Sequence, residues 1–250
     1  PDIDRSLALR QLRGKFGWND QTPVVGSILR FSEEKNPRLL VEAAAEAIKA
    51  APNIRFAFFG DGPLLDPMRK LARELGVEDV IALPGATKEP WAELAGMDVF
   101  VLASRMEGLP NVMVEAQIMG VPAVCSGVGG MTETFVSGET GIVAPADCAK
   151  AFSTEIVSLV NDPARLARMS TAAKEFAIGK FSIGKMCADT LAAFENQREI
   201  RIKASETIMT QGNERFWFGR NWHGFIKRNF SEERAETAKN KILGFMGRPS

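Results

Sequence analysis

Short apolar runs alternate with amphipathic segments along most of this chain. The apolar runs predict strands at 23–29, 54–59, 79–83, 97–102, 121–125 and 140–143. Apolar positions at helical spacing predict helices between them, at 37–50, 64–76, 89–96, 111–119 and 130–136. Each connection has about the length of a strand–helix–strand crossover. The pattern therefore predicts an α/β fold with a doubly wound, mostly parallel six-stranded sheet and helices on both faces.

The two ends of the chain lack this alternation. Residues 1–22 are polar and charged with weakly periodic leucines, and we interpret them as a lead-in segment. Extra C-terminal helices are predicted at 147–161 and 163–178, where Asp162 is expected as the N-cap and Pro163 as the first helical residue. A longer helix at 184–205 is expected to leave the domain. The expected domains are a lead-in at 1–22, a sheet domain at 23–205, and a linker with a helical segment at 206–250, a candidate for the start of another domain.

Composition narrows the classes of function. The chain carries 31 Lys and Arg against 31 Asp and Glu, so its net charge favours neither nucleic acid nor an anionic membrane as a partner. The single histidine, His223, lies in the tail, and the three cysteines lack metal-ligand spacing. We therefore expect no metal site and no His-dependent nucleophile in the sheet domain, and we expect Cys125 to be a buried strand residue.

The chain also lacks a recognisable secretory signal and any apolar run of membrane-spanning length. An odd number of cysteines without a pairing logic is typical of a reducing compartment. The sequence therefore predicts a cytoplasmic location.

Two carboxylates flank the start of the predicted helix 111–119. Glu107 lies on the loop that leaves the strand 97–102, and Glu115 lies one turn inside the helix. In open α/β sheets, ligands bind where strands end and helices begin, and free N–H groups there favour an anion such as a diphosphate. Carboxylates beside that anion can accept hydrogen bonds from sugar hydroxyls. The spacing therefore indicates a nucleotide-sugar site.

Several motifs in one order strengthen this interpretation. The run Glu107-Gly108-Leu109-Pro110-Asn111, continued to Glu115-Ala116, resembles the E-x7-E motif of retaining glycosyltransferases with the GT-B fold, family 4 in particular. Other segments similar to that family lie at 25–36, 58–64, 80–85, 128–133 and 137–143. The resemblance spans roughly residues 20 to 200. One departure is Asn36, where the family usually has glycine, and it concerns the backbone shape of that loop.

The resemblance implies the donor-binding, Rossmann-like half of an enzyme that transfers a sugar from a nucleotide diphosphate with retained configuration. Glu107 would hold sugar hydroxyls and help to place the anomeric carbon, and Glu115 would bind the ribose. Arg30 and Lys35 would stabilise the leaving diphosphate, with backbone amides around residues 108–111 as further donors. No covalent nucleophile, metal or cofactor is implied.

Glycine turns at the other strand ends are expected near the same ligand. The Gly60-Asp61-Gly62-Pro63 turn is first a device for tight turning, placed beside the donor by the resemblance. Gly85 would border the nucleotide base, while Trp91 on a short amphipathic helix is more often core than a stacking platform. Gly129 and Gly130 would let the chain turn near the sugar.

The partners implied are a UDP- or GDP-linked sugar and a glycan or lipid-linked acceptor, as in cell-surface polysaccharide biosynthesis. GT-B enzymes resembling this chain place the acceptor site on an N-terminal domain. Because the first predicted strand begins at residue 23, that domain is missing upstream, and we expect this chain to bind donor without transferring sugar. Two alternatives stay open: a GT-B sugar-nucleotide epimerase, which should have histidine or further acids near the sugar, and a non-catalytic nucleotide-sugar binding module.

The tail carries a different pattern. Aromatic and basic residues interleave at 215–225, which leaves open a peripheral membrane association or a partner-docking peptide. The segment from Phe218 to Arg234 resembles the opening segment of bacterial class I methyltransferases. In those enzymes it precedes a first strand and a glycine-rich cofactor loop, neither of which is present in this sequence.

Overall fold

The computed structural model describes residues 3–182, 184–185 and 187–192. The chain divides into two units after Gly179, and the sheet with its helices lies in the first. The described residues from 184 onward are helical. Most of the predicted helix 184–205, His223 and the methyltransferase-like segment lie outside the described residues.

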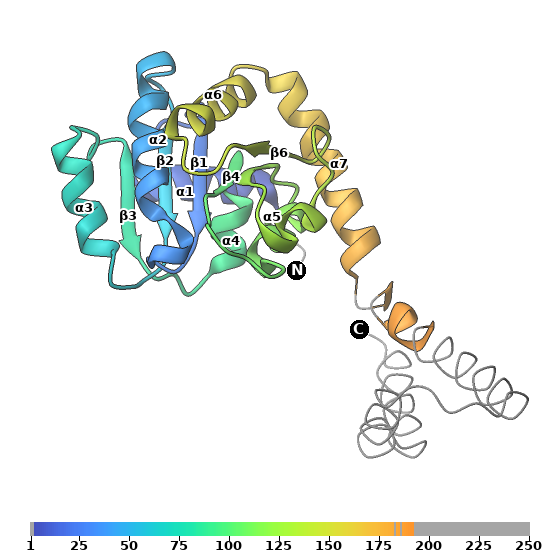
Figure 1. Cartoon of the computed structure of the whole chain (residues 1–250). Coiled ribbons are helices and arrows are strands. Elements are labelled where there is room, and N and C mark those ends of the chain that lie inside the picture. The colour runs from blue at the N-terminus through green and yellow to red at the C-terminus, as the bar shows by residue number, and fades with distance from the viewer. Residues whose placement is uncertain (1–2, 183, 186, 193–250) are drawn as a thin grey trace, which may run out of the picture. The chain divides into compact units, whose positions relative to one another are not determined.

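The first unit is built on one parallel sheet, which confirms the predicted doubly wound α/β fold (Figure 1). Its six strands follow the order β3-β2-β1-β4-β5-β6, so the order reverses between β1 and β4. All pairs are parallel, where the sequence predicted a mostly parallel sheet. The strands are β1 (Val24–Ile28), β2 (Arg55–Phe59), β3 (Ile81–Gly85), β4 (Val99–Leu102), β5 (Ala123–Ser126) and β6 (Gly141–Ala144).

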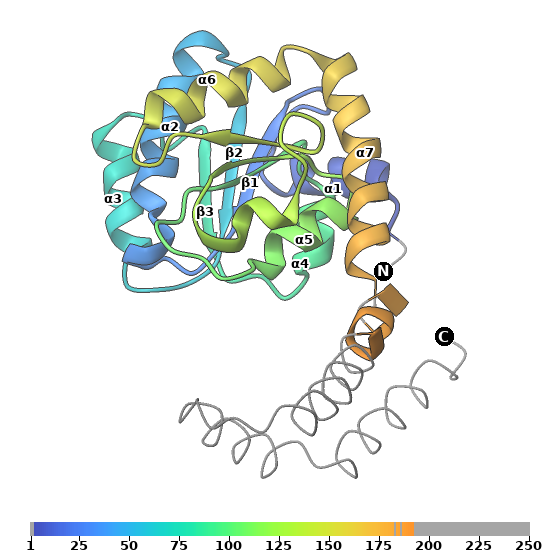
Figure 2. The same cartoon turned by 45° about the vertical axis from the view of Figure 1, so that its right-hand side comes forward.

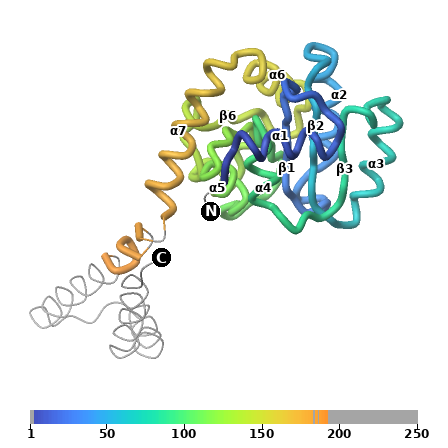
Figure 3. The backbone as a smooth tube through the Cα atoms, turned by 180° about the vertical axis from the view of Figure 1, so that it is seen from behind, coloured from blue at the N-terminus to red at the C-terminus, as the bar shows by residue number. Residues whose placement is uncertain are grey.

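Helices lie on both faces of this sheet. α2 packs against α3 and α6, while α4 packs against α1 and α5 (Figure 2). α1 lies behind the sheet in Figure 1 and in front of it in the reverse view of Figure 3. The helices are α1 (Arg5–Lys15), α2 (Pro37–Ala50), α3 (Leu65–Glu74), α4 (Pro90–Ala95), α5 (Asn111–Ile118), α6 (Ala149–Val160) and α7 (Pro163–Phe181).

Burial on both faces explains why the strands are apolar runs. Every residue of β4 and β5 is buried, and Phe56, Phe58 and Phe100 are at most 1% exposed. Burying each such side chain contributes about 1.5–3 kcal/mol. Cys125 lies in β5, as predicted, and burial raises the pKa of its thiol to about 12, so it stays protonated and unreactive.

Two short elements differ from the sequence prediction. The predicted helix at 130–136 is a 3-10 helix, η2 (Gly129–Thr134), because two glycines at its start favour a tight turn over a regular helix. A second 3-10 helix, η1 (Glu33–Lys35), lies in the loop after β1 and was not predicted. Asp162 does cap α7, since its Oδ1 accepts from the Arg165 N–H at 2.9 Å.

The segment interpreted as a lead-in contains α1. Asp4 caps this helix by accepting from the N–H groups of Ser6 and Leu7, and Ala8 and Leu12 are its buried residues. The remaining positions are mostly polar because only a narrow stripe meets the sheet, which is why the apolar periodicity is weak.

A carboxylate fastens α1 where β1 and β4 begin. Asp98 Oδ2 lies 3.0 Å from the Arg13 guanidinium and accepts from the Val24 N–H at 2.8 Å. Arg13 Nε also donates to the Thr22 carbonyl at 2.8 Å. This ion pair joins α1 to the N-terminal edge of the sheet.

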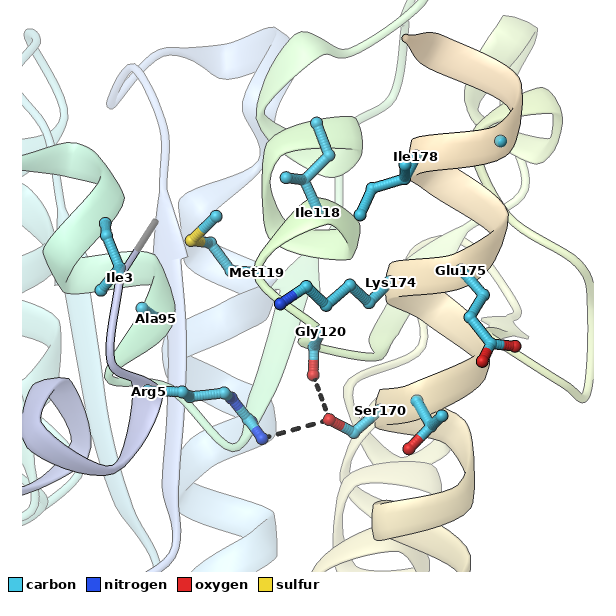
Figure 4. A pocket seen from close by; sticks show the side chains of 12 residues that line it. Ile3, Arg5, Ala95, Ile118, Met119, Gly120, Ser170, Lys174, Glu175 and Ile178 are labelled. Atoms are coloured by element: carbon cyan, nitrogen blue, oxygen red, sulfur yellow. Dashed lines mark hydrogen bonds between the residues drawn. The ribbon is translucent and has the colours of Figure 1, made fainter. Parts of the chain in front are cut away.

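A groove of about 600 Å³ lies at the same edge (Figure 4). Its walls combine apolar side chains with polar and charged ones, Lys174 and Glu175 among them. The Arg5 guanidinium, also in the wall, donates to Ser170 Oγ at 3.1 Å and to the Met97 carbonyl at 3.0 Å. Ser170 in turn donates to the Gly120 carbonyl at 2.6 Å, so α7 is tied to the turn after α5. Within the described ranges, no helix has the length and apolar character needed to cross a membrane.

Candidate functional site

The carboxyl ends of β1 and β4 meet at the point where the strand order reverses. Val25 pairs with Val99 and Gly26 with Phe100, so the loops that follow these two strands are neighbours. In doubly wound sheets, the crevice outside such a reversal is the usual ligand site. The loop after β1 carries Arg30 and the one after β4 carries Glu107. The topology therefore gathers the predicted residues at one place.

Lys35 and Glu107 form an ion pair between the loops that follow β1 and β4. Lys35 Nζ lies 2.6 Å from Glu107 Oε1, and the two side chains are 26% and 7% exposed, respectively. A carboxylate this buried is costly unless it is paired and hydrogen-bonded. The ammonium supplies the pairing, while two of its three N–H donors stay available for another anion.

Two buried serines support the Glu107 carboxylate, Ser104 directly and Ser126 through Ser104. Ser104 Oγ donates to Glu107 Oε1 at 2.7 Å, and Ser126 Oγ donates to the Ser104 carbonyl at 2.5 Å. Within the described part of the chain, no side chain or backbone group binds Glu107 Oε2. The sequence analysis did not select these serines, although each lies at the carboxyl end of a buried strand, where a hydroxyl has few structural reasons to be.

Glycines let η2 pack directly onto the loop that carries Glu107. A Cβ on Gly129 would lie 1.9 Å from the Glu107 carbonyl oxygen, and one on Gly130 would lie 2.4 Å from that of Gly108. Either contact is far inside van der Waals distance, so any side chain here would displace the loop. Gly129 also has a φ of +55°, which glycine adopts without strain.

The turn at Gly60 and Asp61 links the ends of β1, β2 and β3. A Cβ on Gly60 would lie 1.7 Å from the Leu29 carbonyl, and the Gly60 N–H donates to the Gly85 carbonyl at 2.9 Å. The Asp61 carbonyl accepts from the Phe31 N–H at 2.9 Å. These contacts give the turn a packing role at the edge of the crevice. The nearby Trp91 is half-buried against the core.

Arg30 and Glu115 do not join the ion pair. Arg30 is exposed in the loop after β1, and its side chain makes no hydrogen bond or ion pair with any described residue. Glu115 is half-buried on α5, and desolvation raises the pKa of its carboxyl. Both groups therefore keep their hydrogen-bonding capacity for a ligand.

Backbone donors complete the site at the start of α5. Gly108, Leu109 and Asn111 are exposed, whereas Pro110 is buried and is the N-cap. Pro110 has no N–H, so the amides near an anion would be those of its neighbours. No hydrogen bond from the Gly108 or Leu109 N–H to another described residue is present. Among the residues described, no three His, Cys, Asp or Glu side chains are grouped to hold a metal ion.

Asn36 stands where the resemblance leads one to expect glycine, and its backbone conformation accounts for this difference. Its φ of 49° and ψ of 51° lie in the left-handed region, which favours glycine and which asparagine tolerates better than most residues. The loop thus keeps the backbone shape that glycine would allow.

Comparisons with known proteins agree with this geometry. Residues 10–176 match the family described as glycosyl transferases group 1. Over 210 residues, or 80% of this chain, the sequence is 32% identical to the GDP-mannose-dependent alpha-(1-6)-phosphatidylinositol monomannoside mannosyltransferase of Mycolicibacterium smegmatis, of which it covers 54%. Over 124 residues, or 50% of this chain, it is 39% identical to the Vi polysaccharide biosynthesis protein VipC/TviE of Salmonella typhi, of which it covers 22%. The chain thus spans about half or less of these relatives.

Solved structures show the same fold. A mutant of S. aureus TarM in complex with Fondaparinux, alpha-GlcNAc-glycerol and UDP matches with a TM-score of 0.62 at 26% identity, over 65% of this chain and 33% of that one. Anabaena Alr3699/HepE in complex with UDP and glucose matches with a TM-score of 0.67 at 23% identity, over 76% of this chain and 55% of that one.

Proposed function

This chain belongs to the glycosyl transferases of group 1, and from that premise we propose that it is the donor-binding half of a retaining enzyme of glycosyltransferase family 4. The observation that carries the proposal is the Lys35–Glu107 pair at the reversal of strand order, with 2.6 Å between Nζ and Oε1. A buried acid and a cation with spare donors at this point suit a ligand that carries both phosphates and hydroxyls.

The diphosphate of the donor lies between two sets of groups in this proposal. Lys35 offers its remaining N–H donors, and exposed Arg30 offers a planar fork. The amides at the start of α5, including that of Asn111, offer backbone donors and the positive end of the helix dipole. When the bond between sugar and diphosphate breaks, negative charge grows on the leaving phosphate, and these fixed donors stabilise it.

The two carboxylates bind the sugar and the ribose, Glu107 the sugar and Glu115 the ribose. Glu107 accepts hydrogen bonds from sugar hydroxyls through Oε2, while Lys35 and Ser104 hold Oε1 and so set the orientation of the group. Glu115 accepts from the ribose, since its half-buried carboxylate gains hydrogen bonds there that it lacks without ligand. The acceptor hydroxyl takes the place of the diphosphate on the anomeric carbon with retained configuration, and no side chain of this site forms a covalent intermediate.

We propose a UDP- or GDP-linked donor. The mycobacterial relative is named for GDP-mannose, and the TarM structure contains UDP. Because this chain covers 54% of the mycobacterial relative, the acceptor, a glycan or lipid-linked molecule, is proposed to bind to another part of the whole protein. Transfer is proposed for that whole protein, in the cytoplasm, where nucleotide sugars are the donors.

Calorimetry of the 250-residue chain with a panel of nucleotide sugars, UDP, GDP and the free nucleosides tests this proposal. The wild type should bind at least one nucleoside diphosphate. The double variant Arg30→Ala/Lys35→Ala should lose about 2–3 kcal/mol of diphosphate affinity, because charge-assisted hydrogen bonds are lost, while nucleoside affinity changes little.

Lys70→Ala is a matched control, since Lys70 on α3 is exposed and pairs with Glu74 at 3.6 Å, away from the crevice. It should bind as the wild type does. A wild type that binds none of these ligands, or equal losses of diphosphate and nucleoside affinity in the double variant, would contradict the proposal. Interconversion of the bound sugar without any acceptor, followed by NMR, would favour an epimerase instead.

A further inference from the structure

One carboxylate outside the predicted site joins the two loops that carry Lys35 and Glu107. Asp147 lies in the loop between β6 and α6. Its Oδ1 accepts from Asn36 Nδ2 at 3.0 Å, and Asn36 directly follows Lys35 in the chain. The same oxygen accepts from the Arg105 guanidinium at 3.3 Å, and Arg105 lies two residues before Glu107. The two loops that carry the ion pair are therefore both bound to Asp147 Oδ1.

The backbone on both sides of this link is unusual. Among the described residues, Asn36 and Asp147 are the two other than glycine with positive φ, at 49° and 58°. Left-handed backbone costs free energy for most residues with a Cβ, and Asn and Asp are the residue types that adopt it most readily after glycine. These two residues bond to each other through their side chains, so the link joins the two left-handed positions.

Arg105 makes the link rigid by a second route. Its N–H donates to the Glu34 carbonyl in η1 at 2.8 Å, and its guanidinium lies 3.7 Å from a carboxylate oxygen of Glu33. The loop after β4 is therefore bound directly to the loop after β1, next to Lys35. Asp147, in the loop between β6 and α6, binds both of these loops.

Exposure argues against a purely stabilising role. The side chains of Arg105 and Asp147 are 50% and 60% exposed, and ion pairs this open contribute little to stability. Asn36, by contrast, is buried. A link that adds little stability but fixes the loops beside Lys35 and Glu107 is suited to positioning.

We propose that Asp147 is a positioning residue for the donor site, which holds Lys35 and Glu107 at the separation that the sugar diphosphate requires. This inference rests on the proposed function for the identity of the ligand. Asp147 acts through Asn36 and Arg105. Without it, the loops keep their folds but sample wider separations, and the bound diphosphate loses part of its preformed contacts.

Glycine substitutions test the link without imposing new strain. Asp147→Gly and Asn36→Gly each remove one side chain of the link and leave a residue that adopts the left-handed backbone freely. In calorimetry with UDP and GDP, each variant should bind the preferred diphosphate about three- to tenfold more weakly, the effect of one lost hydrogen bond. Affinity for uridine or guanosine should change less than about twofold, because the nucleoside does not contact Lys35.

A double variant distinguishes positioning from separate local effects. Because both residues belong to one link, Asp147→Gly/Asn36→Gly should bind the diphosphate no more weakly than the weaker-binding single variant does. Asp147→Asn, which keeps an acceptor for Asn36, should recover part of the affinity. Glu42→Ala, which breaks the exposed Arg38–Glu42 pair on α2, is the control and should bind as the wild type does.

Hydrogen exchange without ligand keeps the inference separate from the proposed function. Asp147→Gly should raise exchange in segments 30–36 and 104–110 but leave 60–64 unchanged. Unchanged exchange in the first two segments would overturn the inference, whatever the ligand results. If both glycine variants bind the diphosphate as tightly as the wild type does, the inference is overturned too. If the wild type binds no diphosphate, the proposed function is overturned instead.

Discussion

The two edges of the sheet each carry a partly buried ion pair, and the pairs differ in what surrounds them. At the N-terminal edge, the Arg13 and Asp98 side chains are 11% and 16% exposed, and both also bond to backbone groups of the sheet and its lead-in. At the carboxyl edge, the partners of the Glu107 carboxylate within the described chain are side chains, those of Lys35 and Ser104. The first pair fastens α1, while the second keeps donors and acceptors that have no partner among the described residues.

The two edges also differ in the polar groups that surround each ion pair. The groove at the N-terminal edge encloses about 600 Å³, yet Arg5 already donates to Ser170 and Met97 there (Figure 4). At the carboxyl edge, the strand order places exposed Arg30, half-buried Glu115 and backbone amides without partners among the described residues. Unpaired polar groups lie at both ends of the sheet, since the buried Arg5 Nε also has no hydrogen-bond partner among the described residues, and the reversal of strand order is what marks the carboxyl end as the candidate site.

The largest effect expected from this comparison is on stability at the N-terminal edge. Asp98→Ala should lower the free energy of unfolding by about 2–4 kcal/mol, because it leaves the Arg13 guanidinium and the Val24 N–H without their acceptor. Denaturant unfolding measures this change. The affinity of the folded fraction for UDP or GDP should stay at the wild-type value, and a selective loss of that affinity would break the comparison.

Glu107→Ala should reduce sugar transfer more than it reduces stability. In the whole enzyme, sugar transfer should fall by about tenfold or more, since the group proposed to orient the sugar in the transition state is lost. The loss of stability should be smaller than for Asp98→Ala, because freed Lys35 is flexible and partly exposed and reaches water. Wild-type turnover in steady-state assays, or a larger loss of stability than Asp98→Ala causes, would contradict the assignment.

The smallest effect concerns Glu115 and depends on pH. Burial raises the pKa of its carboxyl in the folded protein, so ionising the group costs stability as the pH rises through that pKa, and the cost is absent below the unfolded value of 4.5. Glu115→Gln should therefore melt at or above the wild-type temperature at pH 7, with the difference shrinking towards pH 4. Scanning calorimetry at both values measures this difference.

The same variant should bind the nucleoside diphosphate about 1 kcal/mol more weakly, because the amide accepts less strongly than the carboxylate. Higher stability with weaker binding would mark Glu115 as a group kept for a ligand. A variant that melts lower at pH 7, or binds with unchanged affinity, would show that the carboxylate serves the fold instead.

The parts predicted well are those governed by local patterns. Apolar runs buried on both faces predicted all six strands of the sheet, and Asp162 with Pro163 predicted the start of α7. α1 was missed because its buried stripe consists of little more than Ala8 and Leu12, which is too short to stand out from a charged segment. A regular helix was predicted where η2 lies. The glycines there allow close packing on the loop that carries Glu107, and the local sequence pattern does not record such a tertiary contact.

The sequence by itself determined the sheet, the order of its motifs and the kinds of residue at each strand end, because periodicity and turn residues act over short stretches of chain. Only the tertiary structure decided which of those residues meet: Lys35 with Glu107, Ser126 with the Ser104 carbonyl, and Asp147 with Asn36. Partners so far apart in sequence are brought together by strand order and register. Those depend on how the whole sheet packs, and no local pattern records them.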